Sequence, residues 1–389
     1  MMYAKFLPIK NCITIIILAL LSTVHLSAKD RVEWITIFIH GTIGLNQAIC
    51  TQTLKTLLFG RITASPYQHK IEQLRENQNL FHNQAISYLS LRRIDETQIK
   101  KQDSGASLFA FLYEQVQQYT HPTRTAYYTF GWSGLLSSEK RYIEARVLYE
   151  QIIQELETYT HKPKIRIVAY SHGGNVALNL AAVADKTRIP FFVDELILLG
   201  TPIQKSTEYL ICSPLFKKTY LFFSKNDIVQ CIDCFNQGRP SSFSKRCFCS
   251  SKLYNLPDTL TQIEIRIQKK YPLANKPRFK AAPKHIEFWY FNWLQGDGGW
   301  YRPYFYLNPL PLALFTPILV QMTNRYNNNN NTKNPCKRII LTIDLEKEAC
   351  VINEKNCSCK YRYPGISHAL FENTKKIAWD YKKKYNLPA

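Results

Sequence analysis

The stretch that most constrains this chain is residues 165–178, where an apolar strand pattern meets a helical pattern at a serine. Ser171 therefore lies on a tight strand–turn–helix connection, in a strained conformation that projects its Oγ away from both elements. Neighbouring segments crowd such a turn, so the residues two before and two after the serine must be small, as Ala169 and Gly173 are. The pattern is A-x-S-x-G rather than G-x-S-x-G, and alanine still meets the steric demand. The turn predicts a nucleophilic serine, although an ordinary connection containing serine would share the pattern.

Strand patterns alternate with helical patterns on both sides of this turn, which predicts an α/β protein with a mostly parallel sheet covered by helices on both faces. In such sheets, ligand-binding residues collect at the carboxyl ends of the strands. The predicted strands are 32–39, 125–130, 165–170, 191–199, 218–223 and 261–267, and the predicted helices are 48–58, 107–119, 139–157 and 175–185. Strand 261–267 is expected to be the last strand of the core.

Two further strand ends carry residues that suit acyl-transfer chemistry. The first predicted strand ends in His40, Gly41 and Thr42; Gly41 allows a sharp turn, so that the amide of Thr42 can point at a ligand oxygen and form part of an oxyanion hole. Asp227 follows strand 218–223. A serine becomes a good nucleophile when an imidazole takes its proton and a carboxylate orients that imidazole. Ser171 and Asp227 therefore require a histidine later in the chain.

Two histidines are candidates for this base. His285 follows the last predicted core strand by one loop, and is favoured for that reason. His368 lies just before a predicted terminal helix at 371–385, and would require all of the intervening chain to be an insertion. The choice between them stays open at this point.

The chain resembles the α/β-hydrolase family, and in particular its lipase-like and esterase-like members. Four matches in the family's order carry the resemblance, over residues 33 to about 290: Phe38–Thr42, Ala169–Gly174, Leu198–Pro202 and Phe223–Asp227. The resemblance implies that Ser171 attacks an acyl carbonyl, that Asp227 orients the base, and that the backbone amides of Thr42 and His172 hold the oxyanion.

The expected activity is hydrolysis of a carboxylic ester through an acyl-enzyme, without a metal or cofactor in the chemistry. An acyltransferase using the same triad is one alternative. A non-catalytic surface or binding protein built on a hydrolase scaffold is the other, favoured by the irregular serine turn and the undecided histidine.

The N-terminus predicts export. Basic residues precede a short apolar run at 12–21, and small residues follow up to Ala28, which is the layout of a secretory signal with cleavage after residue 28. An uncleaved membrane anchor is the alternative. The predicted location is secreted or periplasmic.

Ten cysteines lie beyond the signal, an even number that favours disulfides in an oxidising compartment. Four of them also suggest a zinc site as the alternative, namely Cys231, Cys234, Cys247 and Cys249.

The formal net charge is +21, yet the basic residues are scattered and form no recognisable nucleic-acid module, so we expect no nucleic-acid partner. The expected ligand is a small-molecule or lipid ester, with peripheral contact to an anionic membrane left open. The apolar stretch 301–320 fits either a lipid-facing or substrate-facing flap or a loop packed on the core.

The predicted organisation is a signal peptide, a hydrolase domain, an Asn-rich linker and a small C-terminal α+β extension. These four units span residues 1–28, 29–324, 325–335 and 336–389, in that order. Within the hydrolase domain, an insertion at about 45–105 is a candidate cap over the site.

Overall fold

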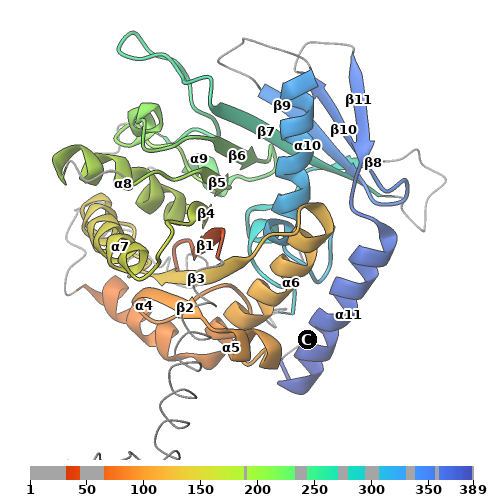
Figure 1. The fold of residues 1–389 in the computed structure, drawn as a ribbon, viewed down its shortest axis with the longest axis horizontal. Coiled ribbons are helices and arrows are strands. Elements are labelled where there is room, and N and C mark those ends of the chain that lie inside the picture. Colours follow the sequence, from red (N-terminus) through yellow and green to blue (C-terminus); the bar gives the residue numbers. More distant parts are fainter. Residues whose placement is uncertain are drawn as a thin grey trace, which may run out of the picture.

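One mixed β-sheet runs through the protein, with helices on both of its faces (Figure 1). The computed structural model describes residues 32–43, 65–187, 191–232, 243–269, 279–293, 306–329, 338–354 and 359–387. The central strands, in the order β3-β1-β4-β5-β6-β7-β9, all pair in parallel. The protein is therefore an α/β protein, as its sequence predicts. Strand bounds are β1 (Trp34–Ile39), β2 (Ser90–Ile94), β3 (Thr125–Gly131), β4 (Lys164–Tyr170), β5 (Glu195–Leu199), β6 (Thr219–Phe223), β7 (Leu260–Lys269), β8 (Phe279–Ala281), β9 (Arg338–Asp344), β10 (Ala349–Glu354) and β11 (Lys360–Pro364).

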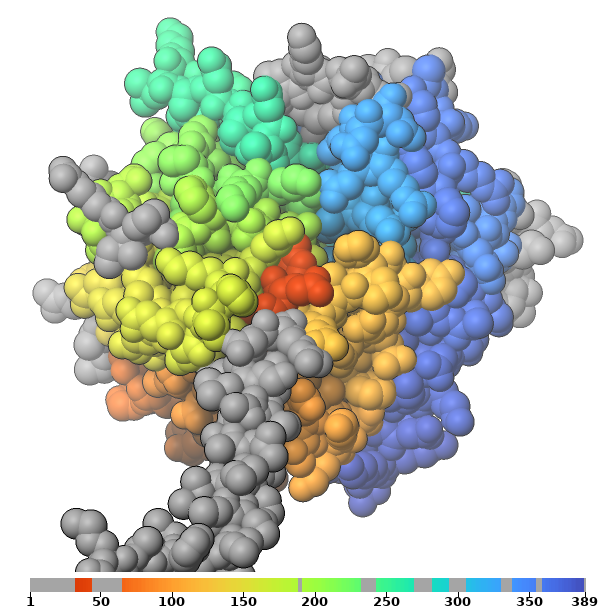
Figure 2. Space-filling model, in the orientation of Figure 1, coloured from red at the N-terminus to blue at the C-terminus, as the bar shows by residue number. Residues whose placement is uncertain are grey.

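Antiparallel strands extend both edges of this parallel centre. β2 pairs with β3 at one edge, whereas β10 and β11 follow β9 at the other, and the short β8 pairs with the end of β7. On the face seen in Figure 2, the red segment that contains β1 shows only as a small patch between later parts of the chain. β1 is a buried interior strand, paired with β3 on one side and β4 on the other, which places the turn after it among the other strand ends.

The side chains of the strands alternate between two cores. In β1, Ile35 and Ile37 join the cluster beneath α7 and α8, while Phe38 joins the cluster beneath α6, α10 and α11. This period of two is what a strand buried on both faces requires. Figure 1 shows the two groups of helices on opposite sides of the sheet. Helix bounds are α4 (Pro66–Glu76), α5 (Glu96–Lys101), α6 (Gly105–Thr120), α7 (Ser138–Glu157), α8 (His172–Thr187), α9 (Val229–Ile232), α10 (Thr316–Asn329) and α11 (His368–Lys384).

The predicted central elements are confirmed within a few residues. The helix expected at 107–119 is α6, and its N-cap is Ser104, whose side chain accepts a hydrogen bond from the backbone N–H of Ser107. The helix predicted at 48–58 and the signal sequence at 1–28 lie outside the described residues. Among the described helices, none combines the length and apolarity needed to cross a bilayer.

The prediction that strand 261–267 ends the core is wrong. β9 pairs in parallel with β7, from Gln262 opposite Arg338 to Gln268 opposite Asp344, and continues the same sheet. The alternate residues Ile339, Leu341 and Ile343 are buried in the core beneath α6 and α10. The segment 336–389 therefore contributes strands to the main sheet, and α11 packs beside α6 (Figure 1).

The expected linker at 325–335 begins inside a helix, because α10 continues to Asn329. Its polar residues hold the helix to its neighbours: Tyr326 donates to Glu354, and the amide of Asn327 donates to the hydroxyl of Thr261. An Asn run resembles a linker in composition, but tertiary hydrogen bonds make its first residues helical. Residues 330–337 lie outside the described chain.

Residues 306–320 pack on the core, which confirms the second of the two interpretations of the apolar stretch at 301–320. Leu314 and Phe315 are fully buried, and Thr316 donates a hydrogen bond to the hydroxyl of Tyr113 in α6. A lipid-facing flap is therefore wrong for residues 306–320, and residues 301–305 lie outside the described chain.

We expect Leu341→Ala to destabilise the whole domain by about 2–5 kcal/mol, because it empties a fully buried site in the shared core. Ile340→Ala, on the half-buried neighbour, is the matched control and should cost less than about 2 kcal/mol. Urea unfolding followed by tryptophan fluorescence measures both. A separate early transition in the Leu341 variant would contradict a shared core.

Candidate active site

The serine turn has the strained geometry that its sequence predicts. Ser171 joins β4 to α8 with φ of +51°, a left-handed conformation that costs a non-glycine residue roughly 1–2 kcal/mol. Hydrogen bonds hold it there: its N–H donates to the carbonyl of Leu199 at 2.9 Å, and its own carbonyl accepts from the N–H of Gly174 at 3.0 Å. The Ser171 side chain is thus fixed at the carboxyl end of the sheet, although the residue is only 4% exposed.

Three glycines make this crowding sterically feasible. A Cβ on Gly41 would lie 2.8 Å from the Cβ of Ser171, and one on Gly173 would lie 2.3 Å from the carbonyl oxygen of His40. A Cβ on Gly174 would lie 2.1 Å from the Oγ1 of Thr201. These contacts are too short for any larger residue, so the turn after β1, the serine turn and the end of β5 meet only because glycine occupies these positions.

The structure brings Ser171, His285 and Asp227 together in one chain of hydrogen bonds. The Nε2 of His285 lies 2.9 Å from the Oγ of Ser171, and its Nδ1 lies 2.7 Å from Oδ2 of Asp227. In the neutral imidazole this pattern places the proton on Nδ1, which donates to the carboxylate, and leaves Nε2 to accept from the serine hydroxyl. The arrangement can take a proton from the serine and stabilise the resulting imidazolium.

The carboxylate of Asp227 is fully buried, four residues beyond β6. Its Oδ1 accepts from the backbone N–H of Gln230 at 3.2 Å, so both of its oxygens have partners. Gly200 provides the space above it. With φ of +56°, Gly200 brings the backbone so close that a Cβ would lie 3.1 Å from Oδ2 of Asp227 and 3.2 Å from Nδ1 of His285.

The choice between the two histidines follows from geometry. His285 begins the short 3-10 helix η3 (His285–Phe288) after β8, and lies against Ser171. His368 is exposed at the start of α11, where its backbone N–H donates to Glu348 at 2.8 Å. The sequence could not decide this because the two histidines lie at similar local signals.

Aromatic packing orients the imidazole of His285. The ring of Tyr170 lies 4.9 Å from it, centroid to centroid, and stacks on Trp289 at 5.6 Å. Burial raises the pKa of Tyr170 well above its usual value, so the phenol stays neutral. Glu287 anchors the same turn by accepting from the N–H groups of Lys284 and Tyr306, and burial raises the pKa of Glu287 to about 7. Sequence reasoning missed these residues because aromatic side chains near a site look like ordinary core.

The two residues expected in an oxyanion hole flank the serine. Thr42 follows Gly41, whose Cα faces Ser171, and His172 is the first residue of α8. Backbone N–H groups at a helix N-terminus point outward and favour negative charge, which suits His172 to this role. The Nδ1 of the His172 ring lies 3.4 Å from the Nδ2 of Asn175.

His40 is a structural residue that shapes the turn after β1. Its Nδ1 donates to the carbonyl of Gly41 at 2.7 Å, and its Nε2 accepts from the backbone N–H of Trp132 at 3.2 Å. The indole N–H of Trp132 donates back to the carbonyl of His40 at 2.7 Å. Burial, and then the nearby charge of Arg75, lower the pKa of His40 to about 3, so its imidazole is neutral. The sequence did not predict this role of Trp132. The only signal for it was its position just after a predicted strand.

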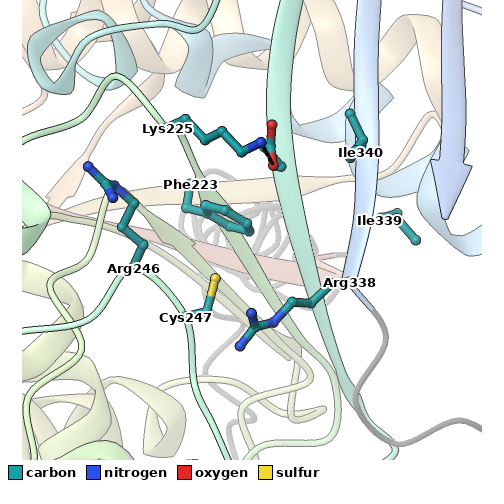
Figure 3. A pocket seen from close by; sticks show the side chains of 8 residues that line it. Phe223, Lys225, Arg246, Cys247, Arg338, Ile339 and Ile340 are labelled. Atoms are coloured by element: carbon teal, nitrogen blue, oxygen red, sulfur yellow. Dashed lines mark ion pairs between the residues drawn. The ribbon is translucent and has the colours of Figure 1, made fainter. Parts of the chain in front are cut away.

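A pocket lies between β6, β7 and β9, lined by residues that include Phe223, Lys225 and Arg246 (Figure 3). Glu264 in this pocket is neutralised by Arg266 at 2.6 Å and Lys225 at 3.6 Å. Arg246 donates from Nε to the backbone carbonyl of Asp227 at 3.1 Å. This hydrogen bond from Arg246, which lines the pocket, therefore stabilises the loop that carries Asp227.

The cysteine predictions stay predictions. Within the described chain, Cys212, Cys231, Cys249 and Cys350 form no disulfide. Burial raises the pKa of Cys350 to about 12, which keeps it a thiol. Four further cysteines lie outside the described residues, namely Cys50, Cys234, Cys336 and Cys357. No group of three or more metal-ligating side chains occurs in the part of the chain that the structure describes, and the suggested zinc site includes Cys234.

Comparison with known proteins adds no family to this description. No protein-family model matches the chain, and no curated protein is significantly similar to it in sequence.

We expect the buried His40 to make folding sensitive to acid. Below the ordinary imidazole pKa of 6.5 the unfolded chain binds a proton at His40, whereas the folded chain does so only near pH 3. The free energy of unfolding is therefore highest above pH 6.5 and decreases as the pH falls. His40 alone should lower it by about 3 kcal/mol between pH 7 and pH 4.

His40→Gln should lower the stability at pH 7 and flatten its pH dependence, because glutamine can donate and accept similar bonds without titrating. Urea unfolding at pH 7, 5.5 and 4 measures the difference from wild type. His121→Gln, at an exposed position, is the matched control and should retain the wild-type slope. An unchanged slope in the His40 variant would contradict a buried neutral imidazole.

Proposed function

We propose that this protein is a serine hydrolase that cleaves a carboxylic ester, with the α/β-hydrolase fold and a Ser171–His285–Asp227 triad. The observation that carries the proposal is the continuous chain of hydrogen bonds from the buried carboxylate of Asp227, through His285, to a serine on a left-handed turn. Three side chains from widely separated parts of the sequence meet with both bond lengths below 3.0 Å.

The topology supports the same proposal. Ser171 follows β4 and Asp227 follows β6, both at the carboxyl ends of parallel strands, and His285, which comes after β7 and the short antiparallel β8, lies against Ser171. Serine, aspartate and histidine in that chain order are typical of α/β-hydrolases. The antiparallel additions at both edges leave this part of the sheet unchanged.

The geometry performs acyl transfer as follows. The Oγ of Ser171 attacks the ester carbonyl carbon while the Nε2 of His285 takes its proton, and the amides of Thr42 and His172 donate to the oxyanion that forms. His285 then gives its proton to the leaving alkoxide, and the acyl group stays on Ser171. Water attacks this acyl-enzyme while His285 takes its proton, and His285 then returns that proton to the Oγ of Ser171 as the carboxylic acid is released. Asp227 stabilises the imidazolium in both half-reactions.

The remaining expectations about partners and location belong to this proposal. The substrate is a small-molecule or lipid ester, and the buried packing of residues 306–320 removes one reason to favour lipid. Export to a secreted or periplasmic location rests on residues 1–28 alone. An acyl acceptor other than water would make the same site an acyltransferase, which product analysis distinguishes.

We expect a fluorophosphonate probe to label the folded protein at Ser171, because only a serine activated by a base attacks such phosphorus centres rapidly. Ser171→Ala should abolish labelling, and His285→Ala should reduce the labelling rate by about 10³-fold or more. Asp227→Asn should reduce ester turnover by about 10⁴-fold, because it destabilises the required imidazole tautomer.

His368→Ala is the matched histidine control and should label as wild type, because that residue is exposed and far along the chain from the triad. Rates are read by gel fluorescence and the site by mass spectrometry. A folded wild type that is not labelled would overturn the proposal in favour of a non-catalytic binding protein.

A further inference from the structure

A buried carboxylate holds the turn that carries the base. His285 begins η3, and Glu287, two residues later, is only 4% exposed. The Oε1 of Glu287 accepts a hydrogen bond of 2.8 Å from the backbone N–H of Lys284. Because Lys284 directly precedes His285, this bond fixes the backbone one residue before the base.

The second oxygen of the same carboxylate bonds a different part of the chain. The Oε2 of Glu287 accepts from the backbone N–H of Tyr306 at 2.9 Å. Tyr306 leads into the 3-10 helix η4 (Leu312–Phe315), which is buried in the core and contacts η3. One side chain therefore joins the turn of the base to a segment anchored in the core, with one oxygen for each bond.

Backbone hydrogen bonds fix the far end of the segment that contains the base. The N–H of Phe291 donates to the carbonyl of Asn83 at 2.9 Å, and the N–H of Asn292 donates to the carbonyl of Pro309 at 2.9 Å. These bonds hold the chain several residues beyond the base, whereas Glu287 holds the start of η3, where the base lies. The position of the imidazole thus depends on the carboxylate more directly than on these backbone bonds.

The carboxyl group of Glu287 can gain or lose its charge near neutral pH. Burial raises its pKa to about 7, against the two N–H donors and then the charge of Lys284, which favour the ionised form. The side chain of Lys284 is exposed, so water weakens its effect. Protonation turns one carboxylate oxygen into a hydroxyl, which is a poorer acceptor, and so weakens one of the two N–H bonds.

Most other titratable groups near this turn are neutral at pH 7. Segment 306–315 contains no Asp, Glu, Lys, Arg or His. In a neighbouring loop, the Nδ1 of His82 lies 2.6 Å from the hydroxyl of Tyr381, and burial lowers the pKa of His82. Burial also raises the pKa of Tyr290 to about 12. Between pH 5.5 and 8.5 we therefore expect Glu287, besides the base itself, to be the group of this turn that changes charge.

We propose that Glu287 is a positioning residue for the base: its ionised carboxylate holds His285 in line with Ser171, and protonation of that carboxylate loosens the turn and lowers turnover in acid. This inference rests on the proposed hydrolase function and adds regulation by pH to the same site. Glu287 acts through the backbone on either side of His285, and the proton transfer itself remains between His285 and Ser171.

The test uses Glu287→Gln, because a side-chain amide has nearly the shape of a protonated carboxyl group and a single acceptor oxygen. On the alkaline plateau near pH 8.5 it should lower kcat for 4-nitrophenyl butyrate by about tenfold, with KM changed by less than about threefold, because a misplaced base slows proton transfer rather than binding. At pH 5.5 wild type is itself protonated at Glu287, so the ratio of the two kcat values should approach one.

Two further variants accompany this comparison. Glu287→Asp keeps the charge but is one methylene shorter, so it cannot reach both N–H donors and should also lose kcat at pH 8.5. Asp194→Asn is the matched control, because Asp194 also accepts from a backbone N–H, that of Ile165 at 2.9 Å, at the opposite end of β4 from Ser171. It should retain the wild-type kcat and pH profile.

Rates are expressed per active site, counted with the fluorophosphonate probe, and a thermal melt at each pH shows whether each variant is folded. A folded Glu287→Gln variant with wild-type kcat at pH 8.5 would overturn the inference, as would a loss of kcat that is the same at pH 8.5 and pH 5.5. If this variant does not fold, wild-type kcat at pH 8.5 in Glu287→Asp overturns the inference, and a loss of kcat there supports it.

These outcomes leave the hydrolase proposal intact, because wild type would still be labelled at Ser171 and would still cleave the ester. A folded wild type that is neither labelled nor active would instead overturn the proposed function, and this inference with it.

Discussion

The left-handed backbone at Ser171 is the constraint on which the rest of the site depends. It directs the Oγ toward His285 and, by reversing the chain sharply, begins α8 one residue later. Such a conformation persists only where contacts with the surrounding structure stabilise it by more than its backbone strain costs. Here the carbonyl of Leu199 accepts the serine N–H, and glycines at positions 41 and 173 allow the backbone of the turn after β1 to approach.

Charged and neutral groups have separate roles around this turn. His40 and Trp132 are buried and exchange neutral hydrogen bonds, which keep the shape of the turn after β1 without introducing charge beside the proposed oxyanion hole. The carboxylate of Asp227 is buried with partners on both oxygens, and lies on the opposite side of the imidazole from the serine. Arg75 is the contrasting group: the residue is half-buried, and its Nε and Nη2 have no hydrogen-bond partner among the described residues.

Local patterns were enough to identify the serine turn and the carboxylate. Ala169, Ser171 and Gly173 are close in sequence, and the steric demand that relates them acts over a few residues. Asp227 was identified because it follows a strand whose apolar pattern is unambiguous. The same reasoning favoured His285 over His368 but did not settle the choice, since the base reaches the serine across the fold. The predictions that were wrong involved contacts between distant segments. Nothing within residues 338–344 indicates that this strand pairs with β7. Parallel strands are joined by long connections, which lack the short turn motif that identifies an antiparallel hairpin in a sequence.

The sequence by itself determined the alternation of strands and helices, the strained serine turn and the order of serine and aspartate, since each depends on neighbours along the chain. The Asn-rich segment after residue 324 has the composition of a linker, whereas in the structure its first residues continue α10 as far as Asn329 and bond to Thr261 and Glu354. The tertiary structure alone decided which histidine meets Ser171 and how far the sheet extends. Those outcomes depend on pairing and burial between residues tens to hundreds of positions apart, and such contacts leave no local pattern from which to infer them.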